Sequence, residues 1–251
     1  KVIIYARDKK IVSSIKNHRI NPRLKYVIFN DNVRSTSNIQ DLQDFDYIFI
    51  ALPSQNIREV IKEFKFKDKN QNIIIASKGI EIQSQSFLYD VIKAETNNSN
   101  ISILSGPCFS NEVAQNLPTA VTLAAERREA FDKVKSLFQN NNFRLYYSDD
   151  LIGCQLGGAI KNIYAIASGI TLGMNLGENA KSALIARSFA EIIRFGNNLG
   201  ANPQTLFGLS GLGDLILTCN SLKSRNTSFG HLISSQPKVS ITDHLKSLET
   251  T

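Results

Sequence analysis

Residues 45–54 read Phe-Asp-Tyr-Ile-Phe-Ile-Ala-Leu-Pro-Ser, a short apolar run that ends in a turn, and this unit decides the fold. A helical pattern follows it over about residues 55–64. Similar apolar runs recur through the first half of the chain and predict further strands at residues 1–6, 72–77, 101–105, 120–124 and 143–147. Continuous Ile- and Val-rich strands separated by helices predict a mainly parallel sheet that is covered on both faces.

The pattern changes near residue 148. Beyond it the chain predicts helices over residues 151–172, 179–199 and 203–206, with glycines between them. We therefore expect two domains, an α/β domain at residues 1–148 and an all-helical domain at residues 149–251. The last stretch, from about residue 234, is polar and weakly patterned, and no element is predicted there.

The composition is that of a globular protein, with 42% hydrophobic and 20% charged residues in a chain of 251. The longest apolar run is only strand-sized, so no membrane span is expected. The first residues alternate like a strand, so we expect no signal peptide. Cys108, Cys154 and Cys219 are odd in number and lack metal-ligand spacing. These cysteines favour a reducing cytoplasm and predict no metal site.

The net charge of +7 raises the question of nucleic acid. The lysines are scattered and form no basic stripe with interleaved aromatic residues, so we expect no nucleic-acid partner. A positive field would instead attract a small anionic substrate or cofactor.

Four predicted strands end in polar or glycine-containing turns. These ends are at Arg7, Pro53-Ser54, Lys78-Gly79 and Gly106-Pro107. Because an open parallel sheet binds ligands at the carboxyl ends of its strands, we expect a ligand crevice along this edge.

Lys161 lies in the middle of an otherwise apolar helix. Helical spacing predicts a buried stripe of Ile160, Ile163, Tyr164 and Ala167 that Lys161 borders. An unpaired ammonium is costly to bury, so this lysine either reaches out to water or works with a lowered pKa.

Several motifs, taken in order over residues 1–230, resemble the bacterial NAD(P)-dependent glycerol-3-phosphate dehydrogenases. Their sequences are Ser77-Lys78-Gly79, Ser105-Gly106-Pro107-Cys108-Phe109-Ser110-Asn111-Glu112-Val113-Ala114, Asn116-Leu117-Pro118-Thr119-Ala120, Gly157-Gly158-Ala159-Ile160-Lys161-Asn162, Gly177-Glu178-Asn179-Ala180, Gly211-Leu212-Gly213-Asp214-Leu215-Ile216-Leu217-Thr218-Cys219 and Ser224-Arg225-Asn226-Thr227-Ser228-Phe229-Gly230.

The resemblance implies a Rossmann-like N-terminal domain and an all-α C-terminal domain of the 6-phosphogluconate-dehydrogenase-like type. A dinucleotide domain should open with a strand, Gly-x-Gly-x-x-Gly and a helix. This sequence starts where the second strand would start, so we expect that the first βα unit is missing from it. The family's last helical region, which supplies further cofactor contacts, is likewise expected to be missing beyond residue 251.

The resemblance also implies an activity: interconversion of dihydroxyacetone phosphate and sn-glycerol 3-phosphate with NAD(P)H, feeding glycerophospholipid synthesis. Lys161 becomes the expected general acid/base. The expected substrate-binding residues are Lys78, Gly106, Cys108, Lys161, Asn162, Asp214, Thr218, Ser224, Arg225 and Asn226. The expected cofactor-binding residues are Arg7, Pro53, Lys78, Ser110 and Arg225.

Residue chemistry supports part of this assignment. Arg225 offers a guanidinium fork suited to a phosphate, although Ser224-Arg225-Asn226 could equally begin a helix on a solvated loop. Asp214 and Thr218 are four apart and share a helix face. Cys108 stands where the family usually has Ser or Thr, and a thiol is a weak donor, which puts that substrate contact in doubt.

Arg7 ends the first strand, where an NAD-selective domain usually has Asp or Glu, so NADPH is favoured over NADH. Asp8 beside it keeps NADH open. Two other functions stay open: a reductase of another small hydroxy or keto acid on the same scaffold, and a non-catalytic polyanion binder. Apolar helices in the second domain make a homodimer plausible.

Overall fold

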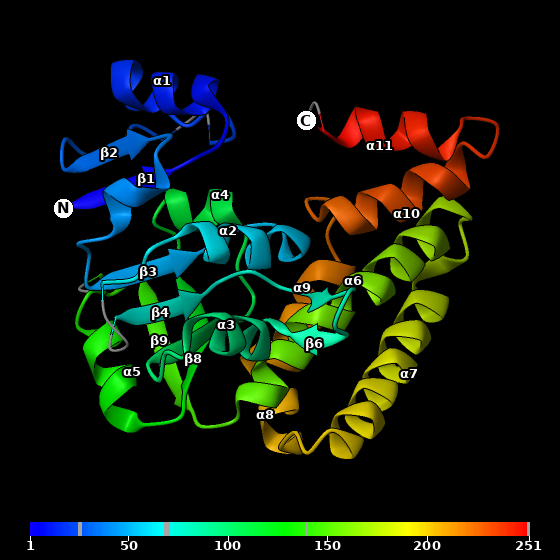
Figure 1. The fold of residues 1–251 in the computed structure, drawn as a ribbon. Coiled ribbons are helices and arrows are strands. Elements are labelled where there is room, and N and C mark those ends of the chain that lie inside the picture. The colour runs from blue at the N-terminus through cyan, green and yellow to red at the C-terminus, as the bar shows by residue number, and fades with distance from the viewer. Residues whose placement is uncertain (25–26, 68–70, 139, 250–251) are drawn as a thin grey trace.

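The computed structural model describes residues 1–24, 27–67, 71–138 and 140–249. It has an α/β lobe followed by a helical lobe (Figure 1). No helix within these residues is both long enough and apolar enough to cross a bilayer.

The α/β lobe contains a five-stranded sheet in the order β3-β4-β7-β8-β9. Its strands are β3 (Tyr47–Ile50), β4 (Asn72–Ile75), β7 (Ile101–Ser105), β8 (Thr119–Ala125) and β9 (Phe143–Ser148). All neighbouring strands are parallel except β7 and β8, which run antiparallel. The predicted sheet is therefore confirmed as mainly parallel.

Two smaller sheets flank it. One pairs β1 (Val2–Tyr5) in parallel with β2 (Val33–Thr36), and the other is the hairpin of β5 (Ile80–Glu81) and β6 (Ser86–Phe87). The helical elements of this lobe are α1 (Lys9–His18), η1 (Ile39–Leu42), η2 (Ser54–Asn56), α2 (Ile57–Glu63), α3 (Leu88–Thr96), α4 (Ser110–Ala114) and α5 (Arg128–Lys135).

Alternation along the strands divides the core of the lobe into two layers. On β4, Ile73 and Ile75 face a cluster that includes side chains of α2 and α3, whereas Ile74 faces the cluster around α5. All three isoleucines are fully buried. A strand that is apolar on both faces in this way occupies the interior of a covered sheet.

Two residues separate the end of β9 from the first helix of the helical lobe. Its elements are α6 (Leu151–Gly173), α7 (Gly177–Asn198), α8 (Pro203–Phe207), the π-helix η3 (Leu209–Gly213), α9 (Asp214–Cys219), α10 (Arg225–Ser235) and α11 (Ile241–Glu249). The long helix α6 runs from the α/β lobe into the second lobe and packs against α7, α9 and α10 (Figure 1).

The buried stripe predicted on α6 is confirmed only in part, because Ile160 and Tyr164 pack against the core of the second lobe but Ile163 does not. Ile163 is 65% exposed, whereas Gly157, Ala165 and Gly169 are buried. Small residues face inward because neighbouring backbone lies close: a Cβ on Gly169 would lie 2.1 Å from the carbonyl oxygen of Thr227. Lys161, one turn from Gly157 and from Ala165, therefore lies within the buried stripe and not at its border.

The elements that the sequence patterns missed are β2, α1, η1, α3, α4, the small hairpin and α11. Helix α11 occupies the stretch from residue 234 that had no predicted element, and it buries His244.

Candidate active site

Lys161, Asp214 and Thr218 meet in the helical lobe. The Lys161 Nζ atom donates to Asp214 Oδ1 at 2.6 Å and to Thr218 Oγ1 at 3.0 Å. The Lys161 side chain is only 12% exposed and that of Asp214 only 1%. The lysine thus does not reach out to solvent, and its ammonium is held by a buried carboxylate.

Lys78 approaches the same carboxylate from the α/β lobe. It follows β4, and its Nζ atom donates to the Gly106 carbonyl oxygen at 3.2 Å and forms an ion pair with Asp214 Oδ2. Gly158 on α6 makes room for this side chain, because a Cβ there would lie 3.1 Å from Lys78 Cδ. One aspartate therefore joins a strand end of the sheet to the second lobe.

The surroundings of Lys161 lower its pKa to about 8. Burial has the largest effect because it penalises the charged form, and the positive charge of Lys78 acts in the same direction. The carboxylate of Asp214 opposes both. The amine can consequently give up or take a proton near neutral pH, as a general acid/base must.

Close helix packing places Asp214 and Thr218. A Cβ on Gly157 would lie 2.3 Å from the carbonyl oxygen of Ser210, so only glycine allows α6 to pack this closely against η3 and the start of α9. Thr218 donates to the backbone oxygen of Asp214 at 2.7 Å, and Thr227 donates to that of Thr218 at 2.7 Å. These bonds fix the face that Asp214 and Thr218 share, as their spacing predicted.

Ser224, Arg225 and Asn226 begin helix α10. The buried Ser224 is the N-cap, and its Oγ atom accepts from the Thr227 N–H at 3.3 Å. Arg225 is exposed, and no described residue pairs with its guanidinium. Ser224 thus has a capping role, and Arg225 remains available for a ligand.

The end of β7 contributes Gly106 and Cys108. Gly106 has a φ of +152°, and a Cβ there would lie 3.0 Å from Val121 Cα, so the turn requires glycine. The Cys108 thiol is exposed at this turn, yet partial desolvation raises its pKa. Asn162, one position after Lys161 on α6, is partly buried.

Of the expected cofactor residues, Lys78 lies in the Asp214 cluster and Arg225 begins α10, whereas Arg7, Pro53 and Ser110 lie near other strand ends. Arg7 follows β1 and forms a 3.3 Å ion pair with Glu59 of α2. Pro53 precedes η2, and Ser110 is the first residue of α4; both are exposed. Glu112 of α4 forms a 2.9 Å ion pair with Lys223, which links the two lobes.

Two features of the site were missed from the sequence. Gln55 ties the turn after β3 to the segment after Lys78: it donates to the Ile80 carbonyl at 2.9 Å and accepts from the Ile82 N–H at 3.0 Å. The buried Ser105 Oγ has no hydrogen-bond partner and lines a cavity of about 10 Å³ next to Lys78, about the smallest that can hold one water. Gln55 and Ser105 could have been identified from the sequence, because each is a polar residue next to the end of a predicted strand.

Known proteins give an independent comparison. Residues 1–131 match the family described as NAD-dependent glycerol-3-phosphate dehydrogenase N-terminus, and residues 150–251 match the corresponding C-terminus. A glycerol-3-phosphate dehydrogenase [NAD(P)+] of Erythrobacter litoralis is 42% identical over 230 residues, which cover 91% of this chain and 69% of the relative. One from Clostridium botulinum is 43% identical over 237 residues, covering 93% and 72%.

A solved structure agrees with this relationship. The crystal structure of glycerol-3-phosphate dehydrogenase from Coxiella burnetii superposes with a TM-score of 0.93 at 33% identity, and the match covers 99% of this chain and 76% of that one. Both lobes are therefore those of the family, and this chain belongs to the NAD-dependent glycerol-3-phosphate dehydrogenases.

Proposed function

We propose that this chain interconverts dihydroxyacetone phosphate and sn-glycerol 3-phosphate with NAD(P)H, and that Lys161 is its general acid/base. The observation that carries the proposal is the buried Lys161 ammonium, held at 2.6 Å by Asp214 beside the second cation of Lys78. Family membership supports the same reaction over reduction of another hydroxy or keto acid.

Reduction of the ketone needs a proton for the oxygen that becomes the alcohol. Lys161 Nζ gives that proton, and Asp214 and Thr218 aim the ammonium by accepting its other hydrogen bonds. Lys78 adds positive charge next to the carbonyl oxygen and so stabilises the negative charge that develops there. In the reverse direction, the neutral Lys161 amine takes the proton of the alcohol.

The strand ends of the α/β lobe fit a dinucleotide. They place a guanidinium at Arg7 and exposed turns at Pro53 and Ser110 along the sheet, the kind of edge where α/β folds bind such ligands. The nicotinamide supplies the hydride when it is bound. Arg7 suits the 2′-phosphate that distinguishes NADPH from NADH, so we place NADPH ahead. Residues 1–148 then form the cofactor domain and residues 149–251 the substrate domain.

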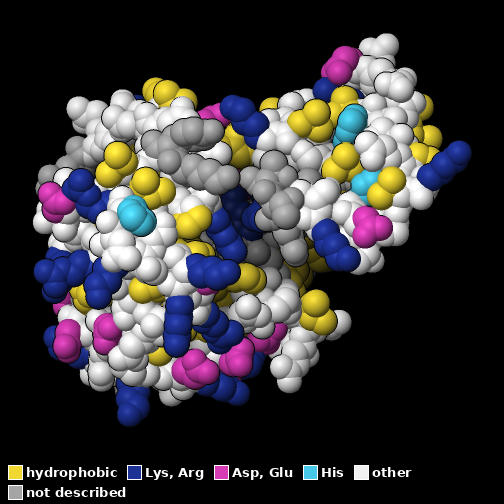
Figure 2. Space-filling model, turned by 90° about the horizontal axis from the view of Figure 1, so that it is seen from above, with side chains coloured by type: hydrophobic (Ala, Val, Ile, Leu, Met, Phe, Trp, Pro, Cys, Tyr) yellow, Lys and Arg dark blue, Asp and Glu magenta, His cyan; other side chains and the backbone are white. Residues whose placement is uncertain are grey.

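The substrate phosphate is assigned to Arg225, with Asn226 next to it and with Asn162 beside Lys161 on α6. Lys and Arg side chains gather around the hollow between the lobes (Figure 2). An exposed guanidinium without a carboxylate partner among the described residues can give both of its parallel N–H groups to phosphate oxygens.

The decisive experiment follows oxidation of NADPH and NADH with and without dihydroxyacetone phosphate. Substrate-dependent turnover is expected, and Lys161→Met should lower kcat by about 10²- to 10⁴-fold, the usual contribution of general acid/base catalysis. Lys223→Met is the matched control, because Lys223 is an exposed lysine that pairs with Glu112 and not with Asp214. Full activity in Lys161→Met would refute the assignment.

We further propose a homodimer and a cytoplasmic location. Large apolar side chains remain exposed on the helical lobe, among them Ile163 at 65% and Phe207 at 59%, which supports pairing between copies. All three cysteines are free thiols, which fits a reducing compartment. Sedimentation velocity tests the first proposal, and fractionation of the source cells tests the second.

A further inference from the structure

Strand β9 is the last strand of the five-stranded sheet, and no described strand pairs with its outer edge. The Thr119 N–H of β8 donates to the Asn142 carbonyl at 2.7 Å, so the main-chain carbonyl of Asn142 faces β8. Because these groups alternate in direction along a strand, the N–H and C=O groups of Leu145 and Tyr147 face the open edge. The edge thus offers a row of unpaired main-chain donors and acceptors.

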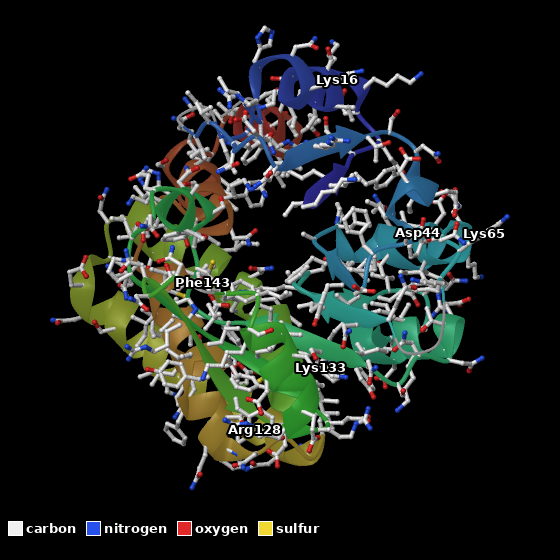
Figure 3. All side chains as sticks on the ribbon, turned by 90° about the vertical axis from the view of Figure 1, so that its left-hand side faces the viewer. Lys16, Asp44, Lys65, Arg128, Lys133 and Phe143 are labelled. Carbon is white, nitrogen blue, oxygen red and sulfur yellow. The ribbon has the colours of Figure 1, made fainter. Side chains whose placement is uncertain are left out.

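A groove of about 610 Å³ follows this edge, between β9 and α5. Every residue from Phe143 to Tyr147 lines it, so the strand itself forms one wall. Figure 3 shows this side of the molecule, with Arg128 and Lys133 on α5 and Phe143 on β9 labelled. A groove that presents the length of an edge strand fits an extended polypeptide.

The lining of the groove is basic and aromatic. Arg128, Lys135 and Arg144 are its charged residues, and the described lining contains no carboxylate. The Arg128 guanidinium lies 4.8 Å from the ring centroid of Phe131. It also forms a 3.5 Å ion pair with Asp132, a residue that does not line the groove. Among the described residues, no carboxylate lies within ion-pair distance of Lys135 or Arg144.

We propose that the open edge of β9 is a docking site for an extended, acidic segment of a partner protein, which pairs with the strand as an added neighbour. Side chains of such a segment alternate between the two sides of the sheet. Lys135 and Arg128 lie on the face of the sheet that α5 covers, and the Arg144 side chain points to the opposite face. Acidic side chains on either face of an added strand therefore meet a cation.

The positive charge of the groove and the spacing of the main-chain groups on β9 favour an acidic polypeptide over other occupants. A second copy of β9 would bring the same cations against one another, and like charges facing each other across a strand pair are destabilising. A nucleic acid has negative charge but does not repeat donors and acceptors at the spacing of a strand. Only an acidic polypeptide satisfies both the main-chain edge and the cations.

Fluorescence anisotropy with a labelled peptide of repeating Val-Glu-Glu-Val, whose glutamates fall on both sides of an added strand, tests the proposal on the whole chain. We expect saturable binding that weakens by about tenfold in Arg144→Glu and in Lys135→Glu. Lys133→Glu is the matched control, since it makes the same charge change on α5 outside the groove. A lysine-containing counterpart should not bind, and N-methylation of every second amide should weaken binding because it removes main-chain donors.

Three results would overturn the proposal: no binding of the acidic peptide, an equal loss in Lys133→Glu, or equal binding of the N-methylated peptide. Self-association of the free protein that is altered by Arg144→Glu, without peptide binding, would assign the edge to a second copy instead. Unchanged dehydrogenase activity in all three variants shows that they are folded.

Discussion

Lys78 and Lys161 hold the two oxygens of one buried carboxylate, although they lie in different lobes: Lys161 contacts Oδ1 of Asp214 and Lys78 contacts Oδ2. Two cations and one anion leave the cluster with a positive charge when both lysines are protonated. That excess attracts an anionic substrate, and it also makes the proton on Lys161 easier to remove.

The pH dependence of the two reaction directions should be opposite. Reduction needs the Lys161 ammonium, so its rate should fall as the pH rises through about 8, the pKa of that group. Oxidation of glycerol 3-phosphate needs the neutral amine, so its rate should rise over the same range. Plots of kcat/KM against pH in both directions check this, and a reduction rate that stays flat across this range contradicts it.

Substitutions at the shared carboxylate and at its second lysine should move that pKa in opposite directions. Lys78→Met removes a neighbouring positive charge, so the pKa of Lys161 should rise. Asp214→Asn removes the charge that opposes burial, so the pKa should fall further. Residual rates measured across pH report both shifts. Losses of activity with an unchanged pH profile would mean that neither residue sets the charge state of Lys161.

How well the sequence predicts each helix or strand depends on how clear the pattern of apolar residues within that element is. The three consecutive isoleucines of strand β4 are fully buried, and this Ile run marks the strand without ambiguity. The missed strand β2, Val-Arg-Ser-Thr, has no such run and exists because β1 lies beside it. Helix α11 is largely polar, and its formation depends on packing against α10.

The candidate site was likewise only partly predictable from the sequence. Motif order and residue chemistry predict that Lys161, Asp214 and Thr218 belong to one site. The sequence could not show that Lys78 reaches the same carboxylate, because 136 positions separate it from Asp214. It also pointed to large apolar residues as the buried face of α6, whereas close packing of backbone on backbone requires the glycines.

Substitutions at two adjacent glycines of α6 should have different effects, one on stability and the other on activity. Gly157→Ala puts a methyl group against the backbone oxygen of Ser210, so it should lower the free energy of unfolding by about 1–3 kcal/mol. Gly158→Ala meets mainly the flexible stem of Lys78, with Ser105 Oγ at an ordinary contact distance of 3.4 Å, so the fold should be retained while kcat falls by roughly tenfold as that lysine is displaced. Thermal unfolding and steady-state kinetics of both variants check this. A Gly158→Ala enzyme with normal kcat contradicts the placement of Lys78.

Arg7 should set the preference between the two cofactors. Arg7→Ala should raise the KM for NADPH by about tenfold and leave that for NADH nearly unchanged, because only NADPH has the 2′-phosphate. Glu59→Gln should act in the other direction by releasing the guanidinium from its 3.3 Å ion pair. KM values for both cofactors in the two variants are the measurement. Equal losses with both cofactors in Arg7→Ala would argue against a 2′-phosphate contact.

Arg225 should report on the phosphate of the substrate. Its guanidinium is exposed at the start of α10 and has no ion-pair partner among the described residues, so Arg225→Ala should change the fold little. Loss of charge-assisted hydrogen bonds to a phosphate should raise the KM for dihydroxyacetone phosphate by about tenfold or more. Lys223→Ala, two positions earlier and paired with Glu112, controls for a general loss of positive charge. Dihydroxyacetone, which lacks the phosphate, distinguishes the two outcomes. Its slow turnover should be unaffected by Arg225→Ala, whereas an equal loss with both substrates would move the phosphate site elsewhere.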